Sequence, residues 1–356
     1  MDNSSYKDFE NQLRALAKEK GAPFYGSFEL TGRCNFDCKM CYVHVADSNE
    51  NRARELSTKE IISIIDSACN HGMLYATLTG GECLLRSDFS EIYSYLINKG
   101  VKVTVKTNAF LISQKHIDLF LKLPPREISV TLYGSNNDVY SKVTGIPAYK
   151  IVTDNILKIH SLGIPLKVSL TPCRYNVNDI PNIVFFLVQN DIKYAISPFL
   201  IPPREGISRD DYFLNADEQL EMLIKVREKI HKPFYNVDLE ALPDVGGNKN
   251  ESIIGIDCSA GSYRFCVTWD GYMVPCLSFD APRIDLRRVP FLDAWRQILD
   301  HNMKVRQPIE CNGCAYKAVC IRCPVCRYDG LYSGHCNTEI CKFTLNKVKS
   351  GLCNFK

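Results

Sequence analysis

Three cysteines in the run from Thr31 to Tyr42 have the spacing of a ligand set for one metal centre. Cys34, Cys38 and Cys41 form a C-x3-C-x2-C pattern directly after an apolar, strand-like segment. Three thiolates on one short loop can hold a cubane iron–sulfur cluster and leave one iron open, as a catalytic zinc keeps a position for its reactant. The spacing therefore predicts a centre that performs chemistry. The alternative is structural zinc, because His44 follows Cys41 by three residues and would close a tetrahedral site.

Two further motifs favour the cluster over zinc. Gly80-Gly81-Glu82 follows the second predicted strand, and Thr107-Asn108 follows the third. The carboxyl ends of parallel strands meet at one edge of a sheet, where such folds bind their ligands. Adjacent glycines let the backbone approach a ligand, and a carboxylate or carbonyl can accept a hydrogen bond from an ammonium group. We therefore expect the cysteine loop and these two motifs to form one site.

The C-terminal part of the chain is unusually rich in cysteine. Of seventeen cysteines, six precede residue 258 and eleven follow from Cys258 onward. In a reducing compartment such a density indicates metal binding rather than disulfides. One alternative is a zinc ribbon built from four of them: Cys311, Cys314, Cys320 and Cys323.

The elements that must position these residues alternate between strand and helix. Strands are predicted over 26–31, 74–79, 101–106, 127–133, 165–171 and 193–199. Helices are predicted over 57–71, 88–99, 113–121, 149–162, 179–188 and 216–230, the first of them from a capping box at Ser57 and a stop at Gly72. Repeated βα units imply a parallel sheet with right-handed crossovers. Six strands are fewer than the eight of a closed barrel, so we predict an α/β fold with a partial (β/α)6 barrel that is open on one side.

Connector signals divide the chain. Pro202-Pro203 and Gly246-Gly247 are typical of loops, and short strands with dense cysteines follow them. The predicted domains are an N-terminal helical extension (1–24), the partial barrel (25–200), a connector with a helix (201–255) and a small cysteine-rich domain (256–356).

The arrangement resembles the radical S-adenosylmethionine (SAM) superfamily, whose hallmark is C-x3-C-x2-C followed by a GGE-type motif. The resemblance implies that Cys34, Cys38 and Cys41 ligate a 4Fe–4S cluster whose open iron binds the amino and carboxylate groups of SAM. It also implies that Gly80, Gly81 and Glu82 bind the ammonium group of SAM. Further SAM contacts are implied at the adenine side, the ribose or the carboxylate, by Met40, Tyr42, Asn108, Ser129, Thr131 and Lys142.

The C-terminal pattern resembles the SPASM extension of radical SAM enzymes, which usually holds two auxiliary 4Fe–4S clusters. The motif begins at Gly271, with G-x4-C ending at Cys276, and then has a C-x2-C-x5-C run. By this resemblance the first auxiliary cluster is held by Cys258, Cys266, Cys276 and either Cys323 or Cys326. The second is held by Cys311, Cys314, Cys320 and Cys341, with Cys336 as the alternative to Cys341.

The resemblance implies radical chemistry. An external electron donor reduces the cluster, SAM is cleaved to a 5′-deoxyadenosyl radical, and this radical abstracts a hydrogen atom from the substrate. SPASM-bearing enzymes mostly modify peptides or proteins, so we expect oxidation of a ribosomally made peptide by a thioether or carbon–carbon crosslink. Formylglycine formation is disfavoured, because Leu277 stands where sulfatase-maturing enzymes carry an aspartate base. Peptide epimerisation, a small-molecule radical SAM dehydrogenase and a non-enzymatic zinc-binding or electron-transfer module remain as alternatives.

Composition excludes several other classes. The net charge is +3 and basic residues form no dense block, which argues against nucleic-acid binding. No apolar stretch is long enough to span a bilayer, and the N-terminus lacks a secretory signal pattern, so a cytoplasmic protein is expected. About 24 residues before the first strand are too few for a peptide-recognition domain. We expect a separate leader-peptide-binding protein, or the barrel itself, to recognise the substrate.

Overall fold

The computed structural model describes residues 3–43, 45–197, 211–231, 255–256, 258–279, 281–321, 323–327 and 334–352. His44, the two connector signals and the end of the strand predicted over 193–199 lie outside these residues. Within the described part, no helix has the length and apolar character needed to cross a membrane.

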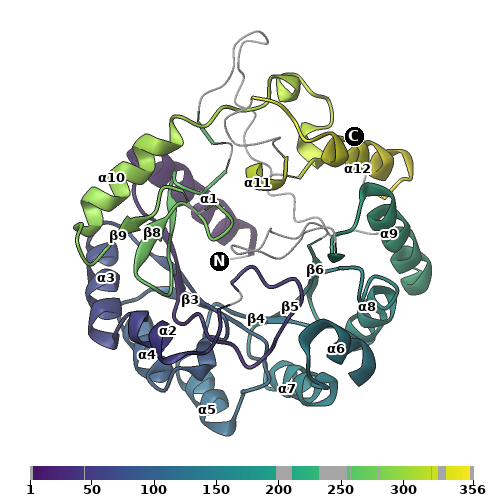
Figure 1. Ribbon diagram of the computed structural model, residues 1–356, viewed down its shortest axis with the longest axis horizontal. Coiled ribbons are helices and arrows are strands. Elements are labelled where there is room, and N and C mark those ends of the chain that lie inside the picture. Colours follow the sequence, from purple (N-terminus) through teal and green to yellow (C-terminus); the bar gives the residue numbers. More distant parts are fainter. Residues whose placement is uncertain are drawn as a thin grey trace.

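One sheet of nine strands organises the described residues, in the order β6-β5-β4-β3-β2-β1-β7-β8-β9. The first six strands are parallel to one another and curve inside a ring of helices (Figure 1). The open α/β fold with six βα strands is confirmed. The bounds of these strands are β1 (Tyr25–Glu29), β2 (Tyr75–Thr79), β3 (Lys102–Thr107), β4 (Glu127–Thr131), β5 (Leu166–Leu170) and β6 (Tyr194–Ile196).

The helices that cover the outer face lie where amphipathic patterns predicted them. In α3 (Thr58–Asn70), the Ser57 hydroxyl accepts from the Glu60 amide, while the Glu60 carboxylate accepts from the Ser57 amide, which completes the capping box. Its apolar face is buried through Ile61, Ile64, Ile65 and Ala68. The other predicted helices are α4 (Phe89–Asn98), α5 (Gln114–Lys122), α7 (Tyr149–Ser161), α8 (Ile180–Gln189) and α9 (Ala216–Ile230).

Several helices complete the described structure. A helix, α1 (Asn3–Lys20), lies in the region expected to be a helical extension. The sequence pattern did not indicate two short helices, α2 (Asn49–Arg54) and α6 (Asn137–Thr144). Helix α2 follows the cysteine loop in the sequence, and α6 contacts the loop in space. Toward the C-terminus lie α10 (Phe291–Asn302), α11 (Pro324–Arg327) and α12 (Thr338–Lys349).

The C-terminal region continues the same sheet. Strand β7 (Arg264–Val267) pairs in parallel with β1, and Ser27 is the partner of Cys266 in that register. Two antiparallel strands follow, β8 (Tyr272–Val274) and β9 (Ile284–Asp285). The domain boundaries near residues 24, 200 and 255 stay predictions, but hydrogen bonds cross the last of them to extend the barrel sheet by three strands.

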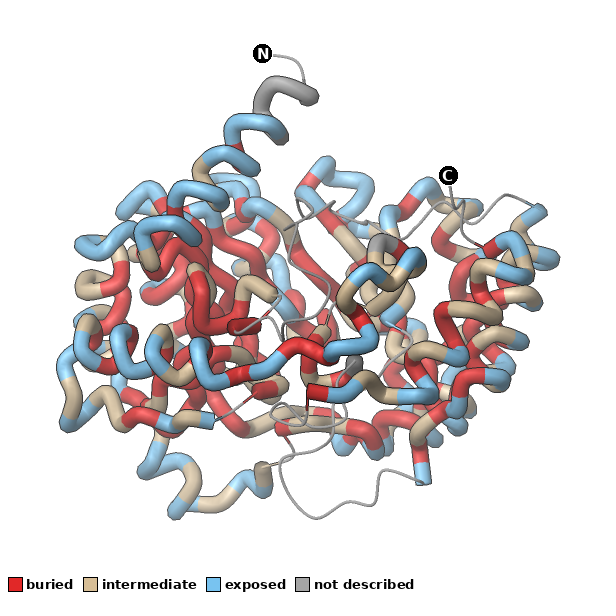
Figure 2. The backbone as a smooth tube through the Cα atoms, turned by 90° about the horizontal axis from the view of Figure 1, so that it is seen from above, coloured by how far each residue is buried: buried red, intermediate tan, exposed pale blue. Residues whose placement is uncertain are grey.

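Aromatic packing joins α10 to both parts of the sheet. The Phe265 ring meets Phe28 on β1 at 6.0 Å and Phe291 on α10 at 5.1 Å between centroids. Trp295 is 1% exposed and donates from its indole nitrogen to the carbonyl of Gly21 at 2.6 Å. Buried residues concentrate along the strands and the inner sides of the helices (Figure 2). This packing holds β7 and the turn after it firmly beside β1.

Candidate active site

The cysteine loop follows β1 and is fixed by backbone hydrogen bonds on two sides. The Leu30 amide donates to Thr79 at the end of β2 over 2.9 Å. The amides of Asp37 and Lys39 donate to carbonyls of Thr144 and Val143, in the last turn of α6, over 2.9 and 3.0 Å. The loop is thus held at the carboxyl edge of the sheet, where the sequence predicted the site.

The three thiols of this loop lie close enough to influence one another electrostatically. Burial, together with the charges of Glu82 and Cys41, raises the pKa of Cys34 to about 12. Burial also raises the pKa of Cys38, with added repulsion from Cys41 and Cys34. Raised pKa values keep these thiols protonated and neutral near neutral pH, because three thiolates in a shielded loop would repel one another. Iron favours their deprotonated form, so the donor set fits a cationic iron–sulfur cluster.

The two glycines of the Gly80-Gly81-Glu82 motif let the backbone of β2 touch the cysteine loop. The Gly81 amide donates to Thr31, and the Glu82 amide donates to Arg33, both over 2.8 Å. A Cβ atom at Gly80 would lie 2.4 Å from the Thr31 carbonyl oxygen, and one at Gly81 would lie 2.2 Å from that of Arg33. No side chain fits there, so the glycine pair sets the distance between the two motifs.

The Glu82 side chain points toward β3 and is 1% exposed. Its carboxylate accepts hydrogen bonds from the Thr107 hydroxyl at 2.8 Å, the Asn108 amide at 2.7 Å and the Leu84 amide at 3.0 Å. Burial raises the pKa of Glu82, and these donors oppose that shift. Contact between Glu82 and a SAM ammonium group stays a prediction. The observed bonds show that this carboxylate already joins β2 to the end of β3.

Asn108 connects the end of β3 to the cysteine loop. Its side-chain nitrogen donates to the Asn35 side-chain oxygen at 2.8 Å and lies 3.8 Å from Cys34 Sγ. The side-chain nitrogen of Asn35 is buried and has no hydrogen-bond partner among the described residues. A buried donor beside the thiols fits an acceptor bound at the loop, such as a sulfide of a cluster.

The remaining predicted SAM contacts are spread around the same edge of the sheet. Ser129 Oγ lies 3.2 Å from Ser169 Oγ on β5, and Thr131 ends β4. Met40 is buried and Tyr42 is half-buried within the loop, while Lys142 is exposed on α6. Their roles stay predictions, as do those of all predicted site residues.

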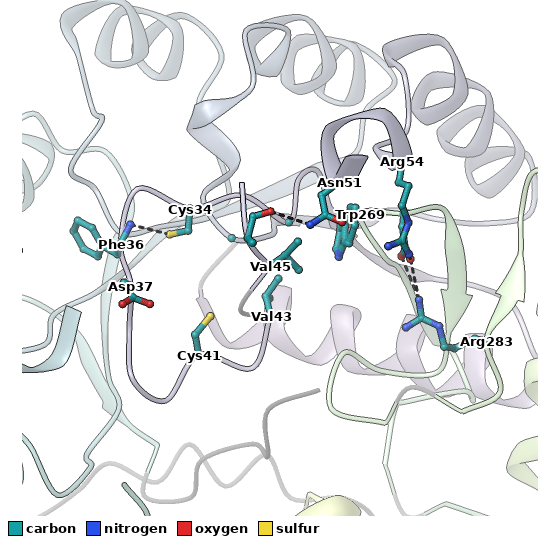
Figure 3. A pocket seen from close by; sticks show the side chains of 14 residues that line it. Cys34, Phe36, Asp37, Cys41, Val43, Val45, Asn51, Arg54, Trp269 and Arg283 are labelled. Carbon is teal, nitrogen blue, oxygen red and sulfur yellow. Dashed lines mark hydrogen bonds and ion pairs between the residues drawn. The ribbon is translucent and has the colours of Figure 1, made fainter. Parts of the chain in front are cut away.

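A cavity of about 570 Å³ opens from the cysteine loop toward the C-terminal strands. Figure 3 shows Cys34 and Cys41 at one end and Arg54, Trp269 and Arg283 at the other, with Val43 and Val45 between them. Gly81 and the backbone of the cysteine loop complete the wall beside the thiols. The sequence analysis missed the far end of this cavity, because Arg54 on α2 and the turn after β7 meet only in three dimensions. The residues concerned are Asn51, Arg54, Trp269, Asp270 and Arg283.

The C-terminal cysteines form a first group around β7 and β8. A hydrogen bond between Cys266 and Cys276 raises the pKa of Cys266 and lowers that of Cys276 to about 5. Burial raises the pKa of Cys258, with repulsion from Cys276 and Cys323. Hydrogen bonding to Cys326 raises the pKa of Cys323. The four ligands predicted for the first auxiliary cluster are among these five cysteines, with Cys323 and Cys326 as alternatives for the fourth.

A second group lies between α12 and the segment before it. Cys336 Sγ is 3.2 Å from Cys341 Sγ, and burial raises the pKa of Cys336, with further contributions from Cys341 and Cys311. Thr344 on α12 donates to Cys320 Sγ at 3.6 Å, and the Cys314 amide donates to the Cys311 carbonyl. Among the described residues, no three His, Cys, Asp or Glu side chains are arranged to hold a single metal ion. The ligand roles of both groups stay predictions.

The first part of the chain matches a known protein family. Residues 28–187 match the model of the radical SAM superfamily. The chain contains a radical SAM domain. Enzymes of this family use a 4Fe–4S cluster and SAM, which are the predicted cofactors, and the three thiols and the orphan donor of Asn35 fit them.

Curated relatives of this chain include proteins named as a heme synthase and a GTP cyclase. An AdoMet-dependent heme synthase of Methanosarcina barkeri is 25% identical over 325 residues, which cover 85% of this chain and 91% of the relative. A probable GTP 3′,8-cyclase of Sulfurisphaera tokodaii is 26% identical over 309 residues, which cover 84% and 93% of the two chains.

Solved structures share the fold across nearly the whole chain. Streptococcus suis SuiB bound to S-adenosylmethionine superimposes with a TM-score of 0.66 at 16% identity, covering 96% of this chain and 84% of SuiB. Native anSMEcpe with bound AdoMet superimposes with a TM-score of 0.69 at 14% identity, covering 94% and 100%. At these identities the likeness shows the fold alone.

Proposed function

We propose that this protein is a radical SAM oxidoreductase that oxidises a ribosomally made peptide, forming a thioether or carbon–carbon crosslink. The observation that carries the proposal is the cavity that has Cys34, Cys41 and Gly81 in its wall and extends to the C-terminal strands. It provides room for a substrate beside the position of an open iron. Among the described residues, the six parallel strands do not close into a barrel.

The fold neighbours support a peptide as the substrate. SuiB has been crystallised with the precursor peptide SuiA, and anSMEcpe with AdoMet and a Cp18Cys peptide. Their TM-scores to this chain are 0.67 and 0.68. Peptides thus bind to two proteins that share this fold, and we propose a peptide as the substrate of the present chain.

The chemistry divides between the cofactors and the chain. When bound, the 4Fe–4S cluster and SAM would remove one hydrogen atom from the substrate, and the second hydrogen would leave as a proton while its electron passes to an auxiliary cluster held by the C-terminal cysteines. Cys34, Cys38 and Cys41 would hold the cluster, and the amide groups of Asn35 and Asn108 would donate hydrogen bonds toward it. Val43 and Val45 line the cavity beside the thiols and exclude water from that wall. A dry wall protects reactive species from side reactions.

The proposal also assigns the C-terminal cysteines to two auxiliary 4Fe–4S clusters of a SPASM-type extension. Their two groups around β7–β8 and α12 support this assignment, because each group brings together cysteines distant in sequence. Leu277 follows Cys276 and carries no base, so the proposal leaves out formylglycine formation. An external electron donor and a separate leader-peptide-binding protein are the partners that the proposal includes.

A second candidate is oxidation of a small polyanionic molecule. It is favoured by the curated relatives, which are named as heme synthases and GTP cyclases and match over 84–85% of this chain. Tetrapyrrole carboxylates and nucleotide phosphates are both anionic, so this candidate predicts binding of a small anion rather than of a peptide chain.

The test is an anaerobic assay of reconstituted enzyme with SAM, a reductant and the peptide encoded beside the gene. We expect 5′-deoxyadenosine and a peptide lighter by two hydrogens, with about twelve irons per chain. Cys34→Ser is expected to abolish 5′-deoxyadenosine formation and to lower iron to about eight. Cys69→Ser serves as the control, because Cys69 is a half-buried thiol on α3.

Three outcomes would contradict the proposal. One zinc and no iron at the cysteine loop would reject radical chemistry. Unchanged peptide mass with inverted stereochemistry would replace crosslinking by epimerisation. Oxidation of a tetrapyrrole or of GTP, with the peptide unchanged, would establish the second candidate.

A further inference from the structure

Two arginines at the far end of the cavity share one buried carboxylate. Asp270 follows β7, and its side chain is 4% exposed. It accepts hydrogen bonds from Arg54 Nη2 at 2.9 Å and Arg283 Nη2 at 3.2 Å, and from the Thr268 hydroxyl at 2.7 Å. Two guanidinium groups and one carboxylate leave a net charge of +1. Arg54, Asp270 and Arg283 are named the arginine clamp below.

The guanidinium groups are held in place by aromatic rings and by a third arginine. Arg54 lies 5.1 Å from the ring centre of Trp269, and Arg283 lies 4.6 Å from that of Tyr272. Arg287 donates to the backbone carbonyls of Asp270 and Arg54 at 2.7 and 2.8 Å. This support fixes the clamp before any ligand arrives, which lowers the entropic cost of binding.

The clamp retains donors for a further anion. An arginine carries five N–H donors in a fixed fork, and each of these two is engaged with Asp270 through Nη2. In the described part of the chain, no side chain or carbonyl accepts from the other nitrogens of Arg54 or Arg283. Their side chains are 52% and 34% exposed, and both line the cavity. A carboxylate can therefore reach the open sides of the forks.

The cavity is electrically polarised between its two ends. At the thiol end, Asp37 forms an ion pair with Lys39 at 3.7 Å and adds no net charge, whereas the arginine clamp at the opposite end carries a net positive charge (Figure 3). A substrate with a negative group at the clamp and a neutral or positive portion near the thiols matches this polarity. The opposite orientation would leave the positive clamp without a negative partner.

We propose that the arginine clamp binds a carboxylate of the substrate, and that under the proposed function this is an acidic side chain of the peptide. The clamp is a specificity-determining site, which orients the chain so that a neighbouring residue lies beside the cysteine loop. The inference rests on the proposed function for the identity of the substrate, but the binding of an anion does not depend on SAM cleavage.

The test is calorimetric titration of anaerobic holoenzyme with SAM and without reductant. The probe is a blocked pentapeptide with three central glutamates, compared with its glutamine analogue. We expect the acidic peptide to bind about tenfold more tightly, as hydrogen bonds between charged groups allow. Arg283→Met is expected to remove this preference, and Arg54→Lys, which keeps the charge but loses the fork, to reduce it.

The matched control is Arg288→Met. Arg288 lies five residues after Arg283, is 85% exposed and pairs with Asp285. The Arg288→Met substitution therefore removes one positive charge outside the cavity. Iron content and circular dichroism show that each variant is folded. The proposal is wrong if the acidic peptide shows no measurable binding or no preference over its analogue, or if Arg288→Met loses as much preference as Arg283→Met.

Pyrophosphate distinguishes a peptide from a small polyanion. Arg283-dependent binding of pyrophosphate, without such dependence for the acidic peptide, would overturn the peptide assignment. The same experiment distinguishes failure of the clamp from failure of the proposed function. A wild-type enzyme that prefers the acidic peptide but cleaves no SAM would support the clamp and reject radical chemistry.

Discussion

The side-chain nitrogen of Asn108 lies 3.8 Å from Cys34 Sγ, although 74 residues separate them. The same side chain donates to Asn35, and the backbone amide of Asn108 donates to Glu82. One residue at the end of β3 therefore contacts both the cysteine loop and the GGE motif. The three motifs that the sequence placed at one sheet edge are in direct hydrogen-bonded contact.

Asn108→Ala is expected to slow SAM cleavage about tenfold, because small misplacements of a reacting group are costly. The lost hydrogen bonds should lower the free energy of unfolding by about 1 kcal/mol. The measurements are 5′-deoxyadenosine formation and denaturant unfolding. Asn182→Ala is the control, since it removes an amide bond to Asp179 on α8 and should affect stability alone. Equal SAM cleavage by the two variants would show that Asn108 has no role at the site.

Gly81→Ala is expected to prevent the GGE motif from packing on the cysteine loop. Its Cβ would lie 2.2 Å from the carbonyl oxygen of Arg33, so backbone must move, at a cost of about 3 kcal/mol in unfolding free energy. Gly100→Ala is the comparison, because that glycine has φ of +80° and no atom within 4 Å of the added Cβ. It should cost about 1 kcal/mol, from the left-handed backbone alone. Thermal unfolding that ranks the two variants in reverse order would refute the packing argument.

Arg86→Lys is expected to destabilise the edge of the sheet by about 2 kcal/mol, as a buried fork is lost. Arg86 is 8% exposed, pairs with Asp88 and donates to the carbonyls of Leu30 and Leu56 at 2.9 and 2.8 Å. A lysine cannot make all these bonds. The control, Arg296→Lys, alters an exposed pair with Asp293 and should change stability by less than about 0.5 kcal/mol. Urea unfolding measures the free energy of unfolding of both variants. Similar losses of stability in the two would show that the buried hydrogen bonds of Arg86 do not stabilise the sheet edge.

The two C-terminal cysteine groups should lose iron independently. Cys276→Ser and Cys341→Ser are each expected to remove about four irons, and the double variant about eight. Iron, sulfide and zinc analysis of anaerobic protein makes the measurement. Cys173→Ser, at a buried thiol just after β5, should leave the iron count unchanged. Stoichiometric zinc that disappears with Cys341→Ser would indicate a zinc site instead.

Local patterns in the sequence were sufficient for the barrel elements. The capping box at Ser57 and the apolar spacing after it place α3, and α9 has the predicted bounds. The predicted ends of β1 to β5 differ from the observed ones by no more than two residues. Helix α6 escaped detection, since its eight residues are too short for a clear amphipathic period.

The sequence by itself predicted which residues form the candidate site, because ligand spacing and strand ends are properties of neighbouring positions. The tertiary structure alone decided that β7 pairs with β1, so that Trp269, Asp270 and Arg283 face the cysteine loop across one cavity. It also decided that Glu82 turns toward Asn108. Strands β1 and β7 are more than two hundred residues apart, and the Phe28 and Phe265 rings pack across them at 6.0 Å between centroids. Local hydrophobic periodicity in the sequence does not show such a long-range contact.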